Sequence, residues 1–499
     1  MNTPQGSSAT ALSPAATGRA AGRAEQRNHA IPVRLTGPAA LRWGARFARD
    51  PLVATRQCYE RFGSFVMLSD VVPFVRPRGV AMLGVPLVLT AGAAFHRELL
   101  SNPASWRGVS LLPGGPRHSA ARRLGAGLTR MTGRRHAYYR SLIAPPLRKS
   151  SIEALTGRMA VLAQAEVATW PAGEPLELWE ITRRLMRRLA IELLFGGAPE
   201  GYEIADLASE LMEGKWSPGA FIPLNLPFTP YGRVLRTAER LERRLLDWIA
   251  SKRSQRDDHD LGSIIINSPD ADGTLPSDEA IAGQMPSLFA AASEAGQSAL
   301  AFTLLLVALH PRVAGELFDE LRGRQGGATP SLEDASGLPS LDGVVKESMR
   351  ILPPVPLQIR VAQADAEIAD YPVPKGTRVM LNTFLVNRTP ELYPDGDFFQ
   401  PERWRAITPN AYEYPVFSAG PHACPGYWFG LSAVKVALAA VLSRYRIVLK
   451  PDTRIDYSVQ PTMRPLNRLR VMLDPEPDTG AAPQVSGSLL NLLKLPSSA

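Results

Sequence analysis

The spacing of apolar and polar positions along the 499-residue chain predicts a mainly helical protein. Apolar residues recur at helical spacing over long stretches, whereas the alternation typical of strands is short and rare. We expect helices within 151–195, 233–253, 277–310, 338–352 and 425–446, a helix followed by a strand at 48–70, and a strand at 378–385. Several prolines in 196–232 favour a loop-rich segment. This pattern indicates a mainly α fold with small β-sheets.

The pattern also predicts how the chain is organised. Pro286 lies inside 277–310, so either a helix begins there or a helix kinks there. The longest apolar run, Ala299 to Leu309, is shorter than the roughly 18 to 20 residues of a membrane span, and we expect no span. We expect one large unit at 37–475 between two tails. Residues 1–36 have the composition of a disordered tail or a transit peptide, and 476–499 are rich in Pro, Ser and Gly.

Charge and cysteine content narrow the classes of partner. The formal net charge is +9, and the stretch from Leu99 to Ile152 has ten Arg and Lys residues but no acidic one. Nucleic acid, an acidic protein and an anionic cofactor are the candidate partners, and the lack of a recognisable nucleic-acid motif disfavours the first. Two cysteines, Cys58 and Cys424, provide no disulfide framework, which favours a reducing compartment such as the cytoplasm.

The segment from Phe417 to Gly426 carries the candidate chemistry. It reads Phe-Ser-Ala-Gly-Pro-His-Ala-Cys-Pro-Gly, and Gly420 and Gly426 permit tight turns around Cys424. Cys424 lies just before a predicted helix that Pro425 can open, and helix N-terminal amides stabilise a thiolate. Such a thiolate is a soft, anionic ligand for a transition metal. An isolated cysteine would otherwise be an ordinary small core residue.

This segment resembles the haem-binding loop of the cytochrome P450 family, whose pattern is Phe-x-x-Gly-x-x-x-Cys-x-Gly. Two further motifs follow the family's order: Glu347-Ser-Met-Arg350, and Pro401-Glu402-Arg403-Trp404. The resemblance covers roughly residues 40 to 475 and implies a cytochrome P450 fold that forms a single large haem-binding unit. It also implies haem b with an axial thiolate from Cys424, and a buried charge triad of Glu347, Arg350 and Arg403 that supports the cysteine loop.

The resemblance extends to the haem propionates. His136 and Arg140 form a His-x-x-x-Arg pair on one helix face, and Arg360 and His422 match two further propionate-binding positions. Cationic and donor groups are chemically suited to two carboxylates. Together with Phe417, Gly420, Cys424 and Gly426, these residues are the expected cofactor-binding set. The His-x-x-x-Arg form is similar to that of soluble bacterial members.

One departure from the family concerns the central helix, where the chain reads Ala291-Ala-Ser-Glu294-Ala295-Gly296. Glu294 retains the family's acidic residue, but Ala295 replaces a threonine whose hydroxyl helps to deliver protons. A methyl group cannot donate a hydrogen bond. Ser298 or Ser293 can place an ordered water instead, a substrate hydroxyl can serve, or the usual monooxygenation does not occur. Glu294 and Ser298 are the candidate catalytic residues.

The resemblance implies a monooxygenase that hydroxylates a small apolar substrate with dioxygen. Electrons would come from a separate acidic ferredoxin or flavoprotein that docks on the basic surface. We expect the pocket to be lined by 104–120, 204–228, 355–359 and about 459–463, with Phe221, Ile222, Leu224 and Phe228 among the apolar candidates and Phe289 as a further one. Two alternatives stay open: a peroxide-driven or non-monooxygenating haem-thiolate enzyme, and a non-catalytic haem- or ligand-binding protein.

Overall fold

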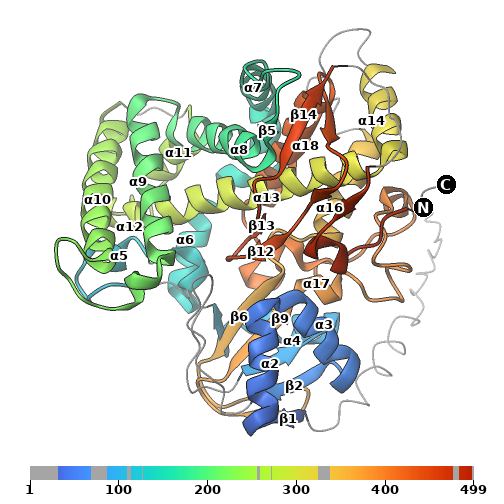
Figure 1. Ribbon diagram of the computed structural model, residues 1–499. Helices are drawn as coiled ribbons and strands as arrows, with labels where there is room; N and C mark the ends of the chain where they lie inside the picture. Colours follow the sequence, from blue (N-terminus) through green and yellow to red (C-terminus); the bar gives the residue numbers. More distant parts are fainter. Residues whose placement is uncertain are drawn as a thin grey trace, which may run out of the picture.

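The computed structural model describes residues 32–68, 87–108, 114–125, 127–255, 259–270, 272–323, 338–475 and 483–496. Most of these residues lie in helices (Figure 1). The longer helices are α2 (Gly37–Arg49), α3 (Pro51–Phe62), α4 (Ala93–Ser101), α6 (Gly133–Ile143), α7 (Lys149–Val167), α8 (Leu178–Phe195), α9 (Pro199–Trp216), α10 (Pro230–Gln255), α13 (Met285–Leu309), α14 (Pro311–Gly323), α16 (Pro339–Ile351) and α18 (Tyr427–Leu442). The expected mainly α fold is confirmed.

Short helices connect these elements and shape the loops between them. The short α-helices are α5 (Ala120–Arg123), α11 (Leu261–Asn267), α12 (Asp278–Ala282) and α17 (Thr383–Val386). The 3-10 helices are η2 (Leu128–Arg130), η3 (Pro145–Leu147), η4 (Pro218–Phe221), η5 (Pro401–Arg405), η6 (Pro415–Phe417), η7 (Gly420–His422) and η8 (Ser488–Asn491). The last turns before α18, η6 and η7, fall in the segment that carries Cys424.

The strands form small sheets. A six-stranded sheet has the order β1 (Val33–Leu35), β2 (Phe65–Leu68), β3 (Leu87–Thr90), β9 (Arg378–Asn382), β6 (Leu357–Ala362) and β4 (Trp106–Gly108). A three-stranded sheet joins β10 (Arg446–Leu449), β14 (Arg470–Asp474) and β5 (Leu176–Glu177). The two-stranded pairs are β11 (Thr453–Arg454) with β15 (Val485–Ser486), β12 (Tyr457–Val459) with β13 (Met463–Pro465), and β7 (Ala366–Ile368) with β8 (Tyr371–Val373).

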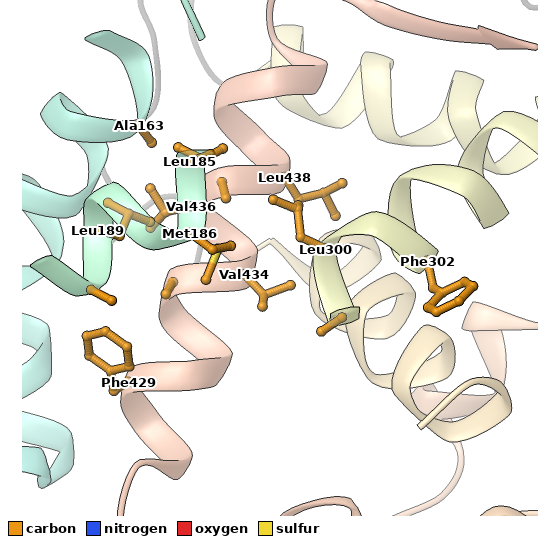
Figure 2. Packing of buried hydrophobic residues seen from close by; sticks show 14 of the residues in the cluster. Ala163, Leu185, Met186, Leu189, Leu300, Phe302, Phe429, Val434, Val436 and Leu438 are labelled. Carbon is orange, nitrogen blue, oxygen red and sulfur yellow. The ribbon is translucent and has the colours of Figure 1, made fainter. Parts of the chain in front are cut away.

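Helix α13 crosses the centre of the molecule and contacts α8, α18 and α16 (Figure 1). Apolar side chains of α8, α13 and α18 interlock in the main core, as Figure 2 shows for Met186, Leu300 and Val434. A Cβ atom on Gly296 would lie 2.5 Å from the Met186 Cε atom, so this glycine allows α8 to approach α13 closely. The core thereby fixes the helix that carries Glu294 and Ala295.

The central helix is also the one helix in the described part of the chain that is long and apolar enough to span a membrane. The stretch Asp278–Leu309 meets this test, although we expected no such segment from the sequence. Its apolar window is 78% buried inside the fold, which is typical of a core helix. Pro286 stands in the first turn of α13, so of the two expected arrangements a helix begins there rather than kinking.

Most predicted elements are confirmed with shifted ends, and one is wrong. The helix–strand pair at 48–70 appears as α3 and β2, and 233–253 lies within α10. The expected loop at 196–232 contains α9, an 18-residue helix that begins at Pro199. Proline is tolerated in the first helical turn, where its missing N–H would have no partner in any case. Only residues 196–198 and 217–229 fit the predicted loop.

The expected tails also need correction. Residues 33–35 form strand β1 and pair with β2, so the predicted N-terminal tail at 1–36 extends too far; residues 1–31 lie outside the described part. Within the predicted tail at 476–499, residues 483–496 pack onto the fold. Leu489, Leu492 and Leu493 are buried, and Arg388 Nη2 donates to the Leu492 carbonyl oxygen at 2.9 Å. Burial of these leucines holds the segment against the main core.

Candidate functional site

Cys424 lies in a tightly folded loop between η7 and α18. The Cys424 N–H donates to the Phe417 carbonyl oxygen at 2.8 Å, which closes the loop on itself. Gly420 has a φ of +65°, and a Cβ atom there would lie 2.4 Å from the Leu100 carbonyl oxygen of α4. Only glycine fits this combination of left-handed backbone and close approach. Helix α18 begins at Tyr427, two residues later than Pro425, where we expected it.

The loop environment acts on the Cys424 thiol in opposite directions. Burial raises the pKa of Cys424, whereas the Gly426 N–H and the charge of Arg140 lower it. The expected stabilisation of a thiolate by backbone N–H groups is therefore present, although burial outweighs it in the protein alone. Cys58 lies elsewhere, on α3, where burial raises the pKa of its thiol to about 11. Only Cys424 borders the large cavity described next.

A cavity of about 1440 Å³ runs through the fold from the Cys424 loop to α13. Its lining includes Cys424 with its flanking residues, and Ala291, Glu294 and Ala295 of α13. Apolar residues form much of the remainder, including Leu288, Val355, Leu357, Ile359 and Phe429. A large, mostly apolar cavity with a few polar groups is typical of a binding site for an organic ligand or cofactor.

Four predicted propionate-binding residues meet on the cysteine side of this cavity. His136 and Arg140 come from α6, Arg360 from β6 and His422 from the cysteine loop, and all four line the cavity. The His136 and His422 ring centroids are 4.0 Å apart, and Arg140 Nη1 donates to the Ala423 carbonyl oxygen at 2.7 Å. In the described part of the chain, none of these four side chains pairs with a carboxylate.

This cationic set fits a cofactor that brings its own carboxylates. Burial, with the charges of His136, Arg360 and Arg140, lowers the pKa of His422 to about 4, and its Nε2 atom is buried without a hydrogen-bond partner. Burial alone lowers the pKa of Arg360 to about 10. Buried polar atoms are rarely left without partners, so acceptor groups are required here. Haem, with two propionates and an iron that accepts a thiolate, satisfies this donor set.

The predicted charge triad is present beneath the site. Arg350 donates to Glu347 through Nε and Nη2 at 2.8 Å each, and Arg403 Nε donates to Glu347 Oε1 at 3.0 Å. Arg350 also donates to three backbone carbonyl oxygens, those of Asn387, Gly396 and Phe398. Trp404 Nε1 completes the set by donating to Glu347 Oε2 at 3.0 Å. Trp404 belongs to the same sequence motif as Arg403, but no role was predicted for it.

The α13 wall departs from the sequence-based expectation at its serines. Glu294 borders the cavity, and burial raises the pKa of its carboxyl group, while Arg464 lowers it. Ser298, however, does not line the cavity, and its hydroxyl donates to the Met463 carbonyl oxygen at 2.7 Å. Ser293 donates to the Phe289 carbonyl oxygen at 2.8 Å and does not line it either. The candidate role of Ser298 in catalysis is therefore not supported by its position.

The apolar residues that we expected to line the pocket divide into two groups. Val355, Leu357, Ile359 and residues 459–462 line the cavity as expected. The aromatic and aliphatic side chains between α9 and α10 do not: Phe228 is 79% exposed and Ile222 is 63% exposed. Phe289 is buried against Phe195 instead. Ser488 and Asn491 of the C-terminal segment line the cavity, which no local sequence signal had indicated.

Comparisons with known proteins agree with this geometry. A family model described as cytochrome P450 matches residues 86–473. The chain is 28% identical over 370 residues to cyclooctat-9-en-7-ol 5-monooxygenase from Streptomyces melanosporofaciens, a match that covers 72% of this chain and 80% of that protein. It is 26% identical over 362 residues to pentalenene oxygenase from Streptomyces avermitilis, which covers 70% and 80%.

Solved structures show the same fold. The haem domain of cytochrome P450DA aligns with a TM-score of 0.74 at 21% identity and covers 89% of this chain and 98% of that one. A retinoic acid-bound cyanobacterial CYP120A1 aligns with a TM-score of 0.70 at 22% identity and covers 84% and 93%. These similarities support the fold of the whole unit that carries the cavity.

Proposed function

Because the chain belongs to the cytochrome P450 family, a family of haem-thiolate oxidoreductases, we propose that it hydroxylates a small apolar substrate with dioxygen and electrons from separate redox proteins. The observation that carries this proposal is a single cavity that joins the Cys424 loop and its cationic residues to the apolar face of α13. Both halves that such a reaction needs, a cofactor site and an apolar substrate site, are continuous with each other.

We assign the cofactor site to the residues on the cysteine side. Cys424 would provide the axial thiolate, and His136, Arg140, Arg360 and His422 would neutralise the propionates. Haem with a thiolate ligand supplies dioxygen activation and O–O cleavage when it is bound. The loop around Cys424 is shaped by Phe417, Gly420 and Gly426. The Phe417 carbonyl oxygen accepts a hydrogen bond from the Cys424 N–H, and the Gly426 N–H faces the thiol. The buried Glu347–Arg350–Arg403 triad would hold the scaffold beneath this loop.

On α13, Glu294 is the residue we propose to hold and transfer protons. Its carboxyl group borders the cavity, and burial raises its pKa, so it stays protonated at a higher pH than an exposed carboxyl group. Ala295 contributes only a methyl group beside it. Since Ser293 and Ser298 are directed to backbone carbonyls, a substrate hydroxyl or an ordered water is the remaining source of the missing hydrogen bond.

We propose a substrate of terpenoid, fatty acyl or aromatic character. Two relatives are named for oxidising cyclooctat-9-en-7-ol and pentalenene, and the cavity walls of this chain are largely apolar. Burial of an apolar substrate against these walls contributes roughly 25 cal/mol per Å² of apolar surface removed from water. The polar groups near α13 would then select the orientation rather than supply most of the binding energy.

We propose that the electron donor is an acidic ferredoxin or flavoprotein that docks beside the cysteine loop, with the protein in the cytoplasm. Arg134, Arg135 and Arg148 are exposed on or near α6, the helix that Arg140 ties to the loop. Oppositely charged surfaces accelerate such encounters, and salt screens them. The rate of reduction should therefore fall as ionic strength rises; a rate independent of salt would contradict this docking surface.

A second candidate is a peroxide-driven haem-thiolate enzyme, which Ala295 specifically favours. The two functions are separated by supplying an apolar compound library with dioxygen, a ferredoxin and its reductase, or with peroxide alone. The proposed function predicts product only in the first mixture. Product only in the second would favour the peroxide reaction, and no turnover across the library would favour a non-catalytic binding protein.

A further inference from the structure

Lys215, in the last turn of α9, is a buried cation that the reaction described above does not use. It is 5% exposed, and its ammonium group has no hydrogen-bond or ion-pair partner among the described residues. Lysine is almost never buried without a partner, because an isolated charge loses its hydration. The charge that acts on it most is another cation: burial and Arg130 together lower the pKa of Lys215 to about 8.

Arg130 of η2 has a similar environment at the more exposed rim. Its Nη1 atom donates to the Gly125 carbonyl oxygen at 2.9 Å, but no carboxylate of the described chain pairs with it. Burial and the charges of Arg122 and Arg107 lower the pKa of Arg130. The sequence offers no local counter-charge, since no acidic residue occurs from Leu99 to Ile152. The two cations thus form a positive site without its own anion.

This positive site flanks the substrate side of the cavity. Met212 and Trp216 of α9 line the cavity, and Lys215 lies beside them on the same helix. Leu128 and Thr129 of η2, the two residues before Arg130, also line it. Ala291 and Ala295 of α13 line the same cavity. Neither Lys215 nor Arg130 lines the cavity itself, but Lys215 directly precedes Trp216 and Arg130 directly follows Thr129, and both of these neighbours line it.

We propose that Lys215 and Arg130 bind the anionic head group of an amphiphilic substrate, a carboxylate or a phosphate, whose apolar body lies in the cavity toward Ala291 and Ala295. This inference rests on the proposed function, since it names the substrate class of the same cavity. An anion at this position would give Lys215 the partner that the fold does not supply. Hydrogen bonds to charged groups are stronger than neutral ones, so the head group would contribute to both affinity and orientation.

The test compares ligands that share a dodecyl chain: dodecanoate, dodecyl phosphate and dodecanol, with a second acid–alcohol pair built on a tricyclic skeleton. Binding to the purified haem protein is followed by the optical shift on titration. We expect an anionic ligand to bind at least tenfold more tightly than its alcohol. Dodecanoate and dodecyl phosphate then show which head group is preferred.

Variants of the two cations distinguish binding of the anionic head group from binding of the apolar chain. Lys215→Met should weaken binding of the anion about tenfold and leave the alcohol within twofold, whereas Lys215→Arg should retain the preference. Lys450→Met, at an exposed position on the surface, is the matched control and should change neither. Arg130→Met, at the exposed rim, serves if Lys215→Met does not fold, and should also weaken the anion selectively.

The carbon monoxide difference spectrum of each protein distinguishes failure of the head-group site from failure of the proposed function. A thiolate-haem band together with no preference for the acids in any pair would overturn this inference and leave the proposed function intact. An unchanged preference in both Lys215→Met and Arg130→Met would overturn it as well. Absence of the band in the haem-loaded wild type would contradict the proposed function, and the inference with it.

Discussion

The Arg140 guanidinium donates a hydrogen bond to the carbonyl oxygen of Ala423, 2.7 Å away, and so ties α6 to the residue that precedes Cys424. The charge of Arg140 also lowers the pKa of the Cys424 thiol, against the effect of burial. One side chain thereby links the cationic wall of the cavity to the proposed axial ligand. Because Arg140 and Ala423 are 283 positions apart in the sequence, this hydrogen bond exists only in the folded chain.

Glu347→Gln should destabilise the protein strongly. The change removes the charge that pairs with Arg350 and Arg403, and Arg350 is fully buried. Breaking one partner of a buried ion pair costs roughly 3 to 5 kcal/mol. Denaturant unfolding followed by circular dichroism measures this loss, and haem content should fall with it.

Glu316→Gln provides the matched control, because Glu316 pairs with Arg312 at a comparable helical spacing on the surface. An exposed pair contributes about 0 to 1 kcal/mol, so this variant should remain close to wild type. Equal losses of stability in the two variants would show that the buried triad has no special structural role.

Gly420→Ala should disturb the cysteine loop. The new Cβ atom would lie 2.4 Å from the Leu100 carbonyl oxygen, in addition to the cost of a left-handed alanine. Gly376→Ala is the control, since Gly376 has a φ of +89° but no atom within 4 Å of the added Cβ. We expect loss of haem binding in the first variant and only roughly 1 to 2 kcal/mol of destabilisation in the second. Full haem retention in Gly420→Ala would refute the close packing of the loop on α4.

Glu294→Gln should change how stability depends on pH. Burial raises the pKa of Glu294 in the folded state, so the folded protein binds this proton more tightly than the unfolded chain does. The resulting cost is absent below the unfolded pKa and develops as pH rises through the folded pKa. The stability of the variant relative to wild type should therefore increase from pH 4, below the ordinary pKa of 4.5, to pH 8 in urea unfolding.

Glu239→Gln, at an exposed position of α10, controls for loss of a surface carboxylate. It should show no comparable trend over this pH range. A constant difference between Glu294→Gln and wild type across the range would mean that Glu294 is not held in an environment that disfavours its charge.

Ala295→Thr tests whether the threonine hydroxyl that Ala295 replaces limits proton delivery. The variant restores a hydroxyl beside Glu294, and general acid catalysis of this kind typically contributes 10²- to 10⁴-fold. We expect the fraction of electrons recovered in product to rise severalfold with dioxygen and a reductase. Ala295→Val has the same shape without the hydroxyl and should show no gain. An unchanged yield in Ala295→Thr would show that the hydroxyl was never limiting.

The sequence predicted the arrangement of the site best where the functional residues lie close together in the chain. Gly420, Cys424 and Gly426 lie within a few residues of each other, and the Glu347–Arg350 pair needs only one helical turn, so their spacing predicts their arrangement. The contact of Arg403 with Glu347 was implied only by the resemblance to the cytochrome P450 family. The structure adds Trp404, whose indole N–H occupies the second Glu347 oxygen.

Side-chain positions that depend on contacts with residues far away in the sequence were not predicted correctly. Ser298 is on the correct helix, but its hydroxyl direction is decided by the Met463 carbonyl oxygen, 165 residues away. Residues 489–493 resembled a tail because their burial depends on contacts with residues such as Arg388. The apolar residues around Phe228 have the composition of a pocket, yet they lie on the surface. Neither periodicity nor composition encodes these choices.

The most direct test of the account is the carbon monoxide difference spectrum of the reduced, haem-loaded protein and two cysteine variants. We expect the red-shifted band of a thiolate-ligated haem in wild type and in Cys58→Ser, and its loss in Cys424→Ser. Absence of the band in wild type, or its persistence in Cys424→Ser, would contradict the assignment of Cys424 as the axial ligand.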